Sequence, residues 1–182
     1  YGHYDTAARG WLGAFQGELP LGEHVVAHVD GMRRDTGTVR IPGFAAVSPD
    51  DEDRPGRLPN SSSEADSYAV GATALGEHGY LGFSVSTLAT DYGVPGAHHH
   101  HEADAHDDDH DDHDHDHGHG AGGANAGTRI DLEQTRYDID AGLDIGRFGI
   151  DRVRTRWSYA DYTHDEVEAT GAVGTRFNNE EI

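Results

Sequence analysis

The sequence contains no cysteine and only one methionine in 182 residues. Without cysteine the chain can form no disulfide, no thiolate metal site and no catalytic thiol, and the absence also argues against a soft copper(I) site. No apolar run reaches about 18 residues, the minimum for a transmembrane helix. Disulfides, thiol chemistry and membrane-spanning helices are therefore not expected in this chain.

Positive charge is also scarce, with 13 Lys and Arg residues against 34 Asp and Glu residues and a formal net charge of −21 at pH 7. Nine of the acidic residues lie within residues 97–127, and the rest of the chain is acidic as well. A protein that binds nucleic acid needs a basic surface against the phosphate backbone. We therefore expect no nucleic-acid partner.

Residues 97–127, the His/Asp-rich segment, contain ten histidines mixed with acidic residues and no aliphatic residue larger than alanine. The segment has nothing to bury, so we expect a mobile loop. Neutral imidazole and carboxylate are the side-chain ligands that zinc, nickel, cobalt and copper(II) prefer, and a carboxylate can also hold the ring of a ligating histidine. The candidate metal ligands are His98, His99, His100, His101, His106, His110, His113, His115, His117, His119, Asp104, Asp107, Asp114 and Asp116.

Two other interpretations of this segment are an expression tag and a solvated acidic spacer. The four consecutive histidines at 98–101 resemble a tag, but they lie inside the chain and continue into Asp-interleaved sequence. Charge runs are usually solvated spacers, yet such spacers are seldom this rich in histidine. The composition favours binding of a divalent transition metal and leaves the identity of the metal open.

Outside the segment, apolar and polar residues alternate with a period of two, which predicts antiparallel β structure throughout. In residues 24–34, for example, Val25 and Val29 share one face, whereas His28 and Asp30 share the other. We expect strands over residues 6–18, 24–34, 67–75, 80–90, 128–144 and 150–166, and a partial strand after Gly174.

The connections between these strands alternate in length. Tight turns are expected near residues 21, 77 and 147, and long connections over residues 35–66 and 91–127. Short periplasmic turns and long outside loops are typical of outer-membrane barrels. Strands of about 9–11 residues are long enough to cross the bilayer when tilted.

Arg152, Arg154 and Arg156 share one face of the last full strand, which suits a water-filled lumen better than the core of a soluble sandwich. A soluble β-sandwich with long loops is the alternative, because it shows the same alternation. The sequence favours an all-β fold of the antiparallel transmembrane β-barrel type. About six to seven strands cannot close such a barrel, and the chain begins at Tyr1 without an initiator methionine, so we expect a fragment of a larger barrel.

Two finer expectations concern the placement of side chains in this barrel. The alternation changes phase above Gln134, where Ile130 and Leu132 fall on the polar side, so we expect either a β-bulge or a strand that extends beyond the membrane. An aromatic girdle at the membrane interface is expected from the tyrosines near strand ends, Tyr80, Tyr92, Tyr159 and Tyr162.

Residues 80–86 read YLGFSVS, and DYGVPG at 91–96 leads from them into the His/Asp-rich segment; RIDLEQTRYD follows at 129–138. This order of motifs resembles the TonB-dependent outer-membrane receptors for zinc. The resemblance covers nearly the whole chain. Motifs similar to the same family lie at residues 30–35, 41–43, 57–60, 159–166 and 174–179.

The resemblance implies a 22-stranded barrel in the outer membrane of a Gram-negative bacterium, closed by an N-terminal plug and energised by TonB. Neither the plug nor a TonB-binding segment is present here, so residues 1–182 are expected to be a partial barrel domain. Residues 97–127 would be an extracellular loop within it. The implied partners are outer-membrane lipid, the TonB complex acting through the missing plug, and the transported metal ion.

These observations combine into one expected mechanism of ion transport. Many weak sites in the His/Asp-rich segment collect dilute Zn²⁺, or a similar divalent transition metal, near the pore. A more ordered site at the barrel mouth then receives the ion. His164 and Glu166 are candidates for it because residues i and i+2 of a strand face the same way, here in series with the inward-facing arginines. An ordinary polar strand end is the alternative, and Asp91 and Asp161 are weaker candidates for the same site.

Two rival functions are a haem or siderophore receptor of the same superfamily and a soluble His-rich metal-binding or storage protein. The first would have little need of ten histidines in one loop, and the second would not depend on detergent. We do not expect an enzyme, because no nucleophile–base pair or phosphate-binding loop is recognisable and the histidines of the segment are not preorganised.

Overall fold

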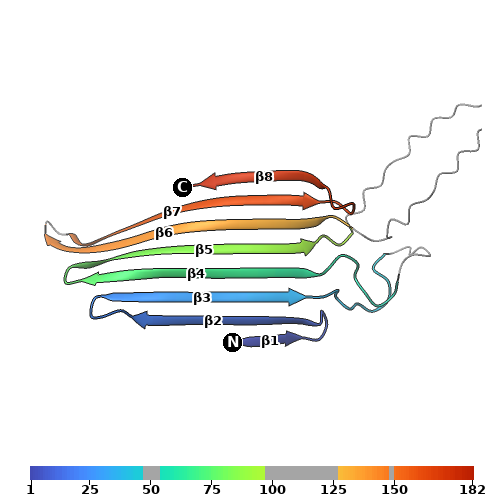
Figure 1. The fold of residues 1–182 in the computed structure, drawn as a ribbon, viewed down its shortest axis with the longest axis horizontal. Coiled ribbons are helices and arrows are strands. Elements are labelled where there is room, and N and C mark those ends of the chain that lie inside the picture. Colours follow the sequence, from blue (N-terminus) through green and yellow to red (C-terminus); the bar gives the residue numbers. More distant parts are fainter. Residues whose placement is uncertain (47–53, 97–126, 148–149) are drawn as a thin grey trace, which may run out of the picture.

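The computed structural model describes residues 1–46, 54–96, 127–147 and 150–182. They form a single sheet in which the strands follow one another in sequence order and every neighbouring pair is antiparallel (Figure 1). The all-β antiparallel class predicted from the alternation is confirmed, and the sheet is not closed. The strands are β1 (Gly2–Asp5), β2 (Gly10–Pro20), β3 (Val25–Thr36), β4 (Ser63–Gly76), β5 (Gly79–Gly93), β6 (Arg129–Arg147), β7 (Ile150–Val167) and β8 (Val173–Glu181).

Five of the expected strands are present as β3 to β7, each extending to within a few residues of its predicted limits or beyond them. The expected first strand, residues 6–18, is wrong at its start, because the chain reverses there between β1 and β2. The Asp5 carboxylate accepts a hydrogen bond from the Ala7 amide at 2.8 Å, and Arg9 adopts a positive φ of 50°. This local side-chain turn replaces the straight strand.

The three expected tight turns, β2–β3, β4–β5 and β6–β7, lie at one end of the sheet. The two long connections, β3–β4 and β5–β6, lie at the other end, which also holds the short connections β1–β2 and β7–β8 (Figure 1). The predicted rhythm of tight turns and long connections is therefore confirmed. No helix in the described ranges is long and apolar enough to cross a membrane.

The phase change above Gln134 is not a β-bulge. β6 pairs with β5 without interruption from Leu143 opposite Gly79 to Arg129 opposite Gly93. Ile130 therefore lies on the polar side of a regular strand, where only 5% of it is exposed. Of the two alternatives, the β-bulge is excluded by this continuous pairing, and the strand that extends beyond the membrane stays a prediction.

Directly opposed residues share a face of a sheet, so the register sorts every side chain onto one of two faces. One side, the apolar face, carries Phe15, Leu19, Val25, Val29, Tyr68, Val70, Leu81, Phe83, Val85, Tyr137, Ile139, Leu143, Val153, Trp157 and Tyr159. The other, the polar face, carries Glu18, His28, Asp30, Ser67, Tyr80, Ser84, Ser86, Gln134, Arg136, Asp138, Asp140, Arg152, Arg154, Arg156 and Ser158.

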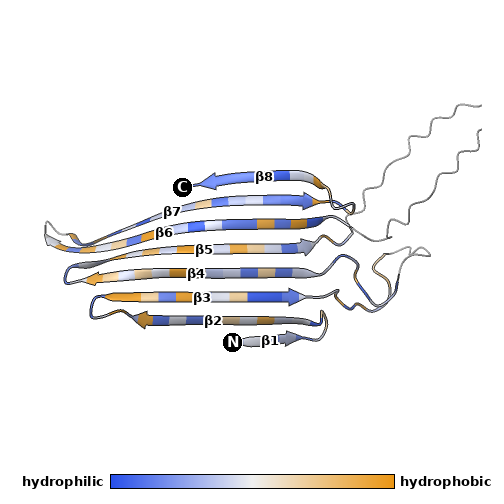
Figure 2. Cartoon of the chain, viewed as in Figure 1, coloured by the Kyte–Doolittle hydropathy of each residue, from blue (hydrophilic) through white to orange (hydrophobic). Residues whose placement is uncertain are grey.

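Nothing in the described part of the chain covers the apolar face. Val70, Leu81 and Phe83 on the central strands are 59%, 56% and 50% exposed. The buried hydrophobic residues of the described ranges are Ala8, Ala65 and Ile130 alone. The described residues thus form a single layer without a sandwich core. Apolar residues concentrate toward the short-turn end of the sheet, as the colouring of β3 shows (Figure 2).

Aromatic rings on the apolar face pack over a glycine. Phe15 on β2 and Tyr68 on β4 lean across Gly31 on the strand between them, and a Cβ at Gly31 would lie 2.6 Å from Phe15 and 2.8 Å from Tyr68. The two rings fill the gap that the missing side chain leaves. Gly31 therefore lets three strands share one aromatic cluster.

We expect Gly31→Ala to destabilise the folded sheet by about 1–3 kcal/mol, the usual cost of overpacking. Gly17→Ala is a matched control, because Gly17 lies on the same face and its Cβ would meet Val29 at an ordinary 3.8 Å. The midpoint of heat modification on a gel compares the two variants with the wild type. Equal midpoints for both variants would contradict the packing role of Gly31.

Candidate metal sites and the polar face

The predicted ligands of the His/Asp-rich segment, His98 to His119 with their interleaved aspartates, lie outside the described residues. Metal binding by them stays a prediction. The structure describes the two flanks of the segment, which leave the ends of the neighbouring strands β5 and β6. Both flanks lie at the same end of the sheet as the connection between β3 and β4 (Figure 1).

His164 lies on the polar face of β7, between Leu132 of β6 and Phe177 of β8. Its ring meets Phe177 edge-on, with the ring centroids 5.6 Å apart, and its Nδ1 lies 3.0 Å from the hydroxyl of Tyr162. Nε2 is buried and has no hydrogen-bond partner among the described residues. If Nδ1 donates to Tyr162, the Nε2 lone pair is the atom left for a ligand, and a neighbouring side chain must move to admit one.

Glu166 shares the polar face with His164, as the spacing predicted, and lies opposite Ile130 and Thr175. Both residues lie in the half of β7 nearest the long connections, in series with Arg154 and Arg156. Within the described ranges, however, no group of three or more histidine or acidic side chains is placed to hold a metal ion. A site at His164 and Glu166 would therefore need ligands from residues outside those ranges, from water or from a rearrangement.

Asp91 and Asp161 do not join His164, so this weaker prediction was wrong. The register places both carboxylates on the apolar face, whereas His164 lies on the polar face. Asp91 pairs there with Arg129, which also donates to the Ser62 hydroxyl at 3.1 Å. Successive residues of a strand point to opposite faces, so Asp161 points away from His164 although it lies only three residues before it. The register places Asp91 of β5 on the same far side.

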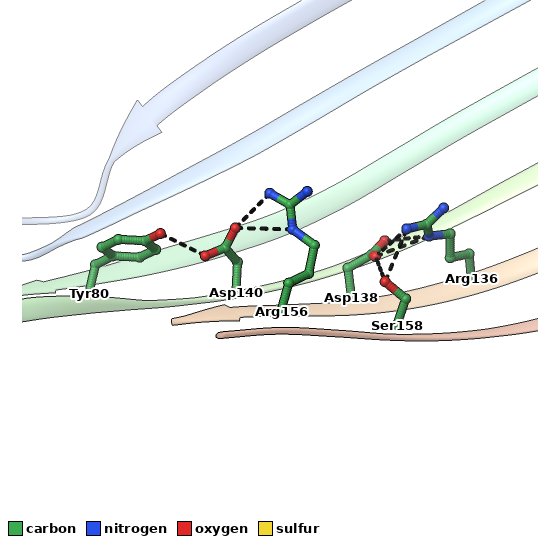
Figure 3. A network of polar contacts seen from close by, with 6 residues as sticks. All are labelled: Tyr80, Arg136, Asp138, Asp140, Arg156 and Ser158. Carbon is green, nitrogen blue, oxygen red and sulfur yellow. Dashed lines mark hydrogen bonds and ion pairs between the residues drawn. The ribbon is translucent and has the colours of Figure 1, made fainter. Parts of the chain in front are cut away.

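Paired charges fill the polar face of β6 and β7 (Figure 3). The Arg156 guanidinium donates to Asp140 at 2.8 Å, and the Arg136 guanidinium donates to Asp138 at 2.8 Å. The Ser158 hydroxyl also donates to Asp138 at 2.6 Å. Asp138 and Ser158 are directly opposed, as are Asp140 and Arg156. Arg156 of the predicted row of arginines is thus compensated by an aspartate across the strand pair, a feature that the sequence interpretation missed.

The same pattern continues toward the short-turn end of β6 and β7. Arg152 donates to Asp144 at 2.5 Å. The Tyr80 hydroxyl donates to Asp140 at 2.6 Å, and the Arg154 guanidinium lies 5.9 Å from the centre of the Tyr80 ring. We call the residues Tyr80, Arg136, Asp138, Asp140, Asp144, Arg152, Arg154, Arg156 and Ser158 the charge ladder.

Tyr80 belongs to the polar face, so the expected aromatic girdle is wrong for three of its four tyrosines. Tyr92 and Tyr162 also lie on the polar face, whereas Tyr159 lies on the apolar face. Tyr159 packs there with Tyr137 and Trp157, at centroid distances of 6.2 and 6.5 Å. Position near a strand end tells how far along the strand a side chain lies. The alternation of side chains along the strand decides which face it takes.

Ion pairs on the apolar side lie beyond the apolar residues, toward the long connections. Arg176 of β8 donates to both carboxylate oxygens of Asp165 of β7, at 2.6 and 2.5 Å. The Arg176 guanidinium holds the pKa of the Asp165 carboxyl below its usual range. The pair ties β8 to β7 and thereby holds Phe177 against the His164 ring.

We expect His164→Gln combined with Glu166→Gln to lower zinc uptake several-fold at limiting zinc, because the amides keep the size of the side chains but ligate metal poorly. Initial rates of uptake by cells that express the full-length receptor provide the measurement. Asp161→Ala, on the same strand but the opposite face, is the control and should leave uptake unchanged. Wild-type uptake by the double variant would make these residues an ordinary polar strand end.

No protein-family model matches the chain. The motifs that resemble the TonB-dependent zinc receptors are therefore the sole support for that family, and membership stays a prediction. The geometry itself establishes an open antiparallel sheet with one apolar face, one polar face with paired charges, and the His/Asp-rich segment inserted between β5 and β6.

Proposed function

We propose that this chain is part of an outer-membrane β-barrel receptor that captures zinc, or a similar divalent transition metal, with its His/Asp-rich segment. The observation that carries the proposal is the uncovered apolar face of a single-layer sheet whose other face is charged. Contact of this apolar face with water would be energetically unfavourable, whereas contact with lipid hydrocarbon would remove the apolar side chains from water.

The dimensions of the apolar face suit a bilayer. On β5 the residues on this face are apolar or small from Leu81 to Ala89, a length of about 27 Å along a strand. A tilt of about 40° reduces this to about 21 Å, against the apolar band of about 25 Å in outer-membrane barrels. On the neighbouring strands, charge on this face begins with Asp66 and Glu133, which lie directly opposite Ala89. Asp91, paired with Arg129, follows on β5.

The charge ladder suits the wall of a polar lumen. Its Arg152–Asp144 and Arg156–Asp140 pairs join β6 to β7, and its Arg136–Asp138 pair lies within β6. The wall therefore keeps little net charge. In a soluble sandwich one face of the sheet would be buried against a second layer. The described residues provide no such layer, which favours the barrel over the soluble metal-storage alternative.

The metal function rests on the composition of the His/Asp-rich segment and on its point of insertion. The segment leaves from the charged end of the sheet, the end that also carries His164 and Glu166. Ions held by many exchangeable sites there would be concentrated near the mouth of the barrel. Further strands, the plug and coupling to TonB belong to the proposal through the family resemblance alone.

Fractionation of cells that express the full-length protein tests the membrane part. We expect a heat-modifiable protein in the outer-membrane fraction that detergent alone releases. The reason is that the apolar face needs hydrocarbon contact to be stable. A protein recovered from the soluble periplasm would contradict the barrel.

A receptor with all ten histidines of residues 98–119 replaced by serine tests the metal part, because it keeps the length and acidity of the segment. We expect slower zinc uptake at low zinc and near-normal uptake at high zinc. The isolated wild-type peptide should bind about three to five ions, less tightly as the pH falls through about 6.5, and copper(II) more tightly than zinc.

Two outcomes of this experiment would reject the zinc function. A peptide that binds no zinc at pH 7.5 would reduce the segment to an acidic spacer. A serine variant that loses uptake of haem or a siderophore, with zinc uptake intact, would favour the rival receptor class.

A further inference from the structure

The side chain of Asn60 joins the two flanks of the His/Asp-rich segment. Its amide Nδ2 donates to the carbonyl of Val94 at 3.1 Å and to the carbonyl of Thr128 at 2.7 Å. These carbonyls lie 34 and 68 residues from Asn60 in sequence. An asparagine amide has two N–H groups, and here each of them reaches a different flank.

The backbone conformation of Asn60 and the glycines on both flanks allow this contact. Asn60 has a positive φ of 52°, a conformation that asparagine tolerates better than most residues. A Cβ at Gly93 would lie 2.2 Å from both the carbonyl and the side-chain oxygen of Asn60, and one at Gly127 would lie 2.8 Å from its Nδ2. Glycine on each flank is therefore what lets Asn60 fit between them.

Neighbouring hydrogen bonds reinforce the closure. The Val94 amide donates to the Thr128 carbonyl at 2.9 Å, and the Gly93 amide donates to the Ser62 carbonyl at 3.1 Å. Arg129 binds both Asp91 and the Ser62 hydroxyl. We call Asn60, Ser62, Asp91, Gly93, Val94, Gly127, Thr128 and Arg129 the neck.

Asn60 is itself held by a folded connection. The Leu58 amide donates to the Val39 carbonyl at 2.9 Å, the Ser61 hydroxyl donates to the Leu58 carbonyl at 2.6 Å, and the Val39 amide donates to the Ser61 hydroxyl at 2.9 Å. These bonds fix the residues on either side of Asn60 to the chain that follows β3. The neck therefore connects the flanks of the segment to the chain between β3 and β4.

We propose that Asn60 is a positioning residue for metal capture, which closes the neck so that ions collected by the segment stay near the polar face. The proposal rests on the proposed function. The local concentration delivered by a tethered binder falls steeply as the tether lengthens. Release of both flanks from Asn60 would lengthen the tether and lower that concentration without changing the ligands.

The test measures initial rates of zinc uptake by the full-length receptor over a range of zinc concentrations. Asn60→Gly removes both side-chain hydrogen bonds but keeps the positive φ at little cost. We expect the half-saturating zinc concentration to rise by roughly 20–30%, because the tether lengthens by only a few residues, with the maximal rate and the amount of heat-modifiable receptor unchanged. Gly93→Ala attacks the same contact from the other flank and should act alike, whereas Gly17→Ala is the matched glycine control.

A covalent rescue separates positioning from folding. Val94 and Thr128 are the next opposed pair after Gly93 and Arg129, and opposed Cα atoms lie about 4.5–5.5 Å apart, within the span of a disulfide. The sequence holds no other cysteine. In the Asn60→Gly receptor, Val94→Cys with Thr128→Cys should restore the wild-type half-saturating concentration when oxidised and not when reduced.

The ten-serine variant of the segment supplies the last comparison. There Asn60→Gly should have no further effect, because no metal-binding segment remains to be positioned. An equal effect in both backgrounds, or a fall in maximal rate and receptor amount alone, would overturn the proposal. If Asn60→Gly leaves uptake unchanged while the serine variant slows it, the positioning role of Asn60 is rejected and the metal function stands. If the serine variant takes up zinc like the wild type, the metal function itself is rejected.

Discussion

Continuous antiparallel backbone pairing holds this sheet together, because the described residues bury almost no side chains. From β2 to β7 the ladders run through most of each strand, and β4 and β5 pair over their whole length. Sheet stability then comes from backbone hydrogen bonds and from cross-strand side-chain pairs. In the proposed barrel, lipid hydrocarbon would cover the apolar face that a second layer covers in a sandwich.

The uninterrupted register has a direct consequence for chemistry. It keeps every residue of one parity on one face, so the arginines of β7 meet the aspartates of β6 rather than the apolar residues between them. It also brings His164 into line with Arg154 and Arg156 and sends Asp91 to the far side. A single slipped residue would exchange the charge ladder for the apolar face.

Much of this arrangement could be predicted from the sequence, because period-two alternation is a strong signal in long strands such as β5 and β7. Parity alone could also have excluded Asp91 and Asp161 from the His164 site and placed Tyr80 on the polar face. The reversal at residues 6–9 was missed because it depends on one carboxylate–amide bond from Asp5. The pairing of Asp140 with Arg156 requires the register between strands, which alternation within one strand does not contain.

Asn60 lies furthest from what a sequence pattern can reveal, since its two partners are 34 and 68 residues away. The antiparallel strand order places both long connections at the same end of the sheet, and the Asn60 contact links them there. The chain between β3 and β4 folds on itself and supplies the group that joins the flanks between β5 and β6. The His/Asp-rich segment gains a defined origin from this contact, and the proposed capture of metal near the polar face depends on that origin.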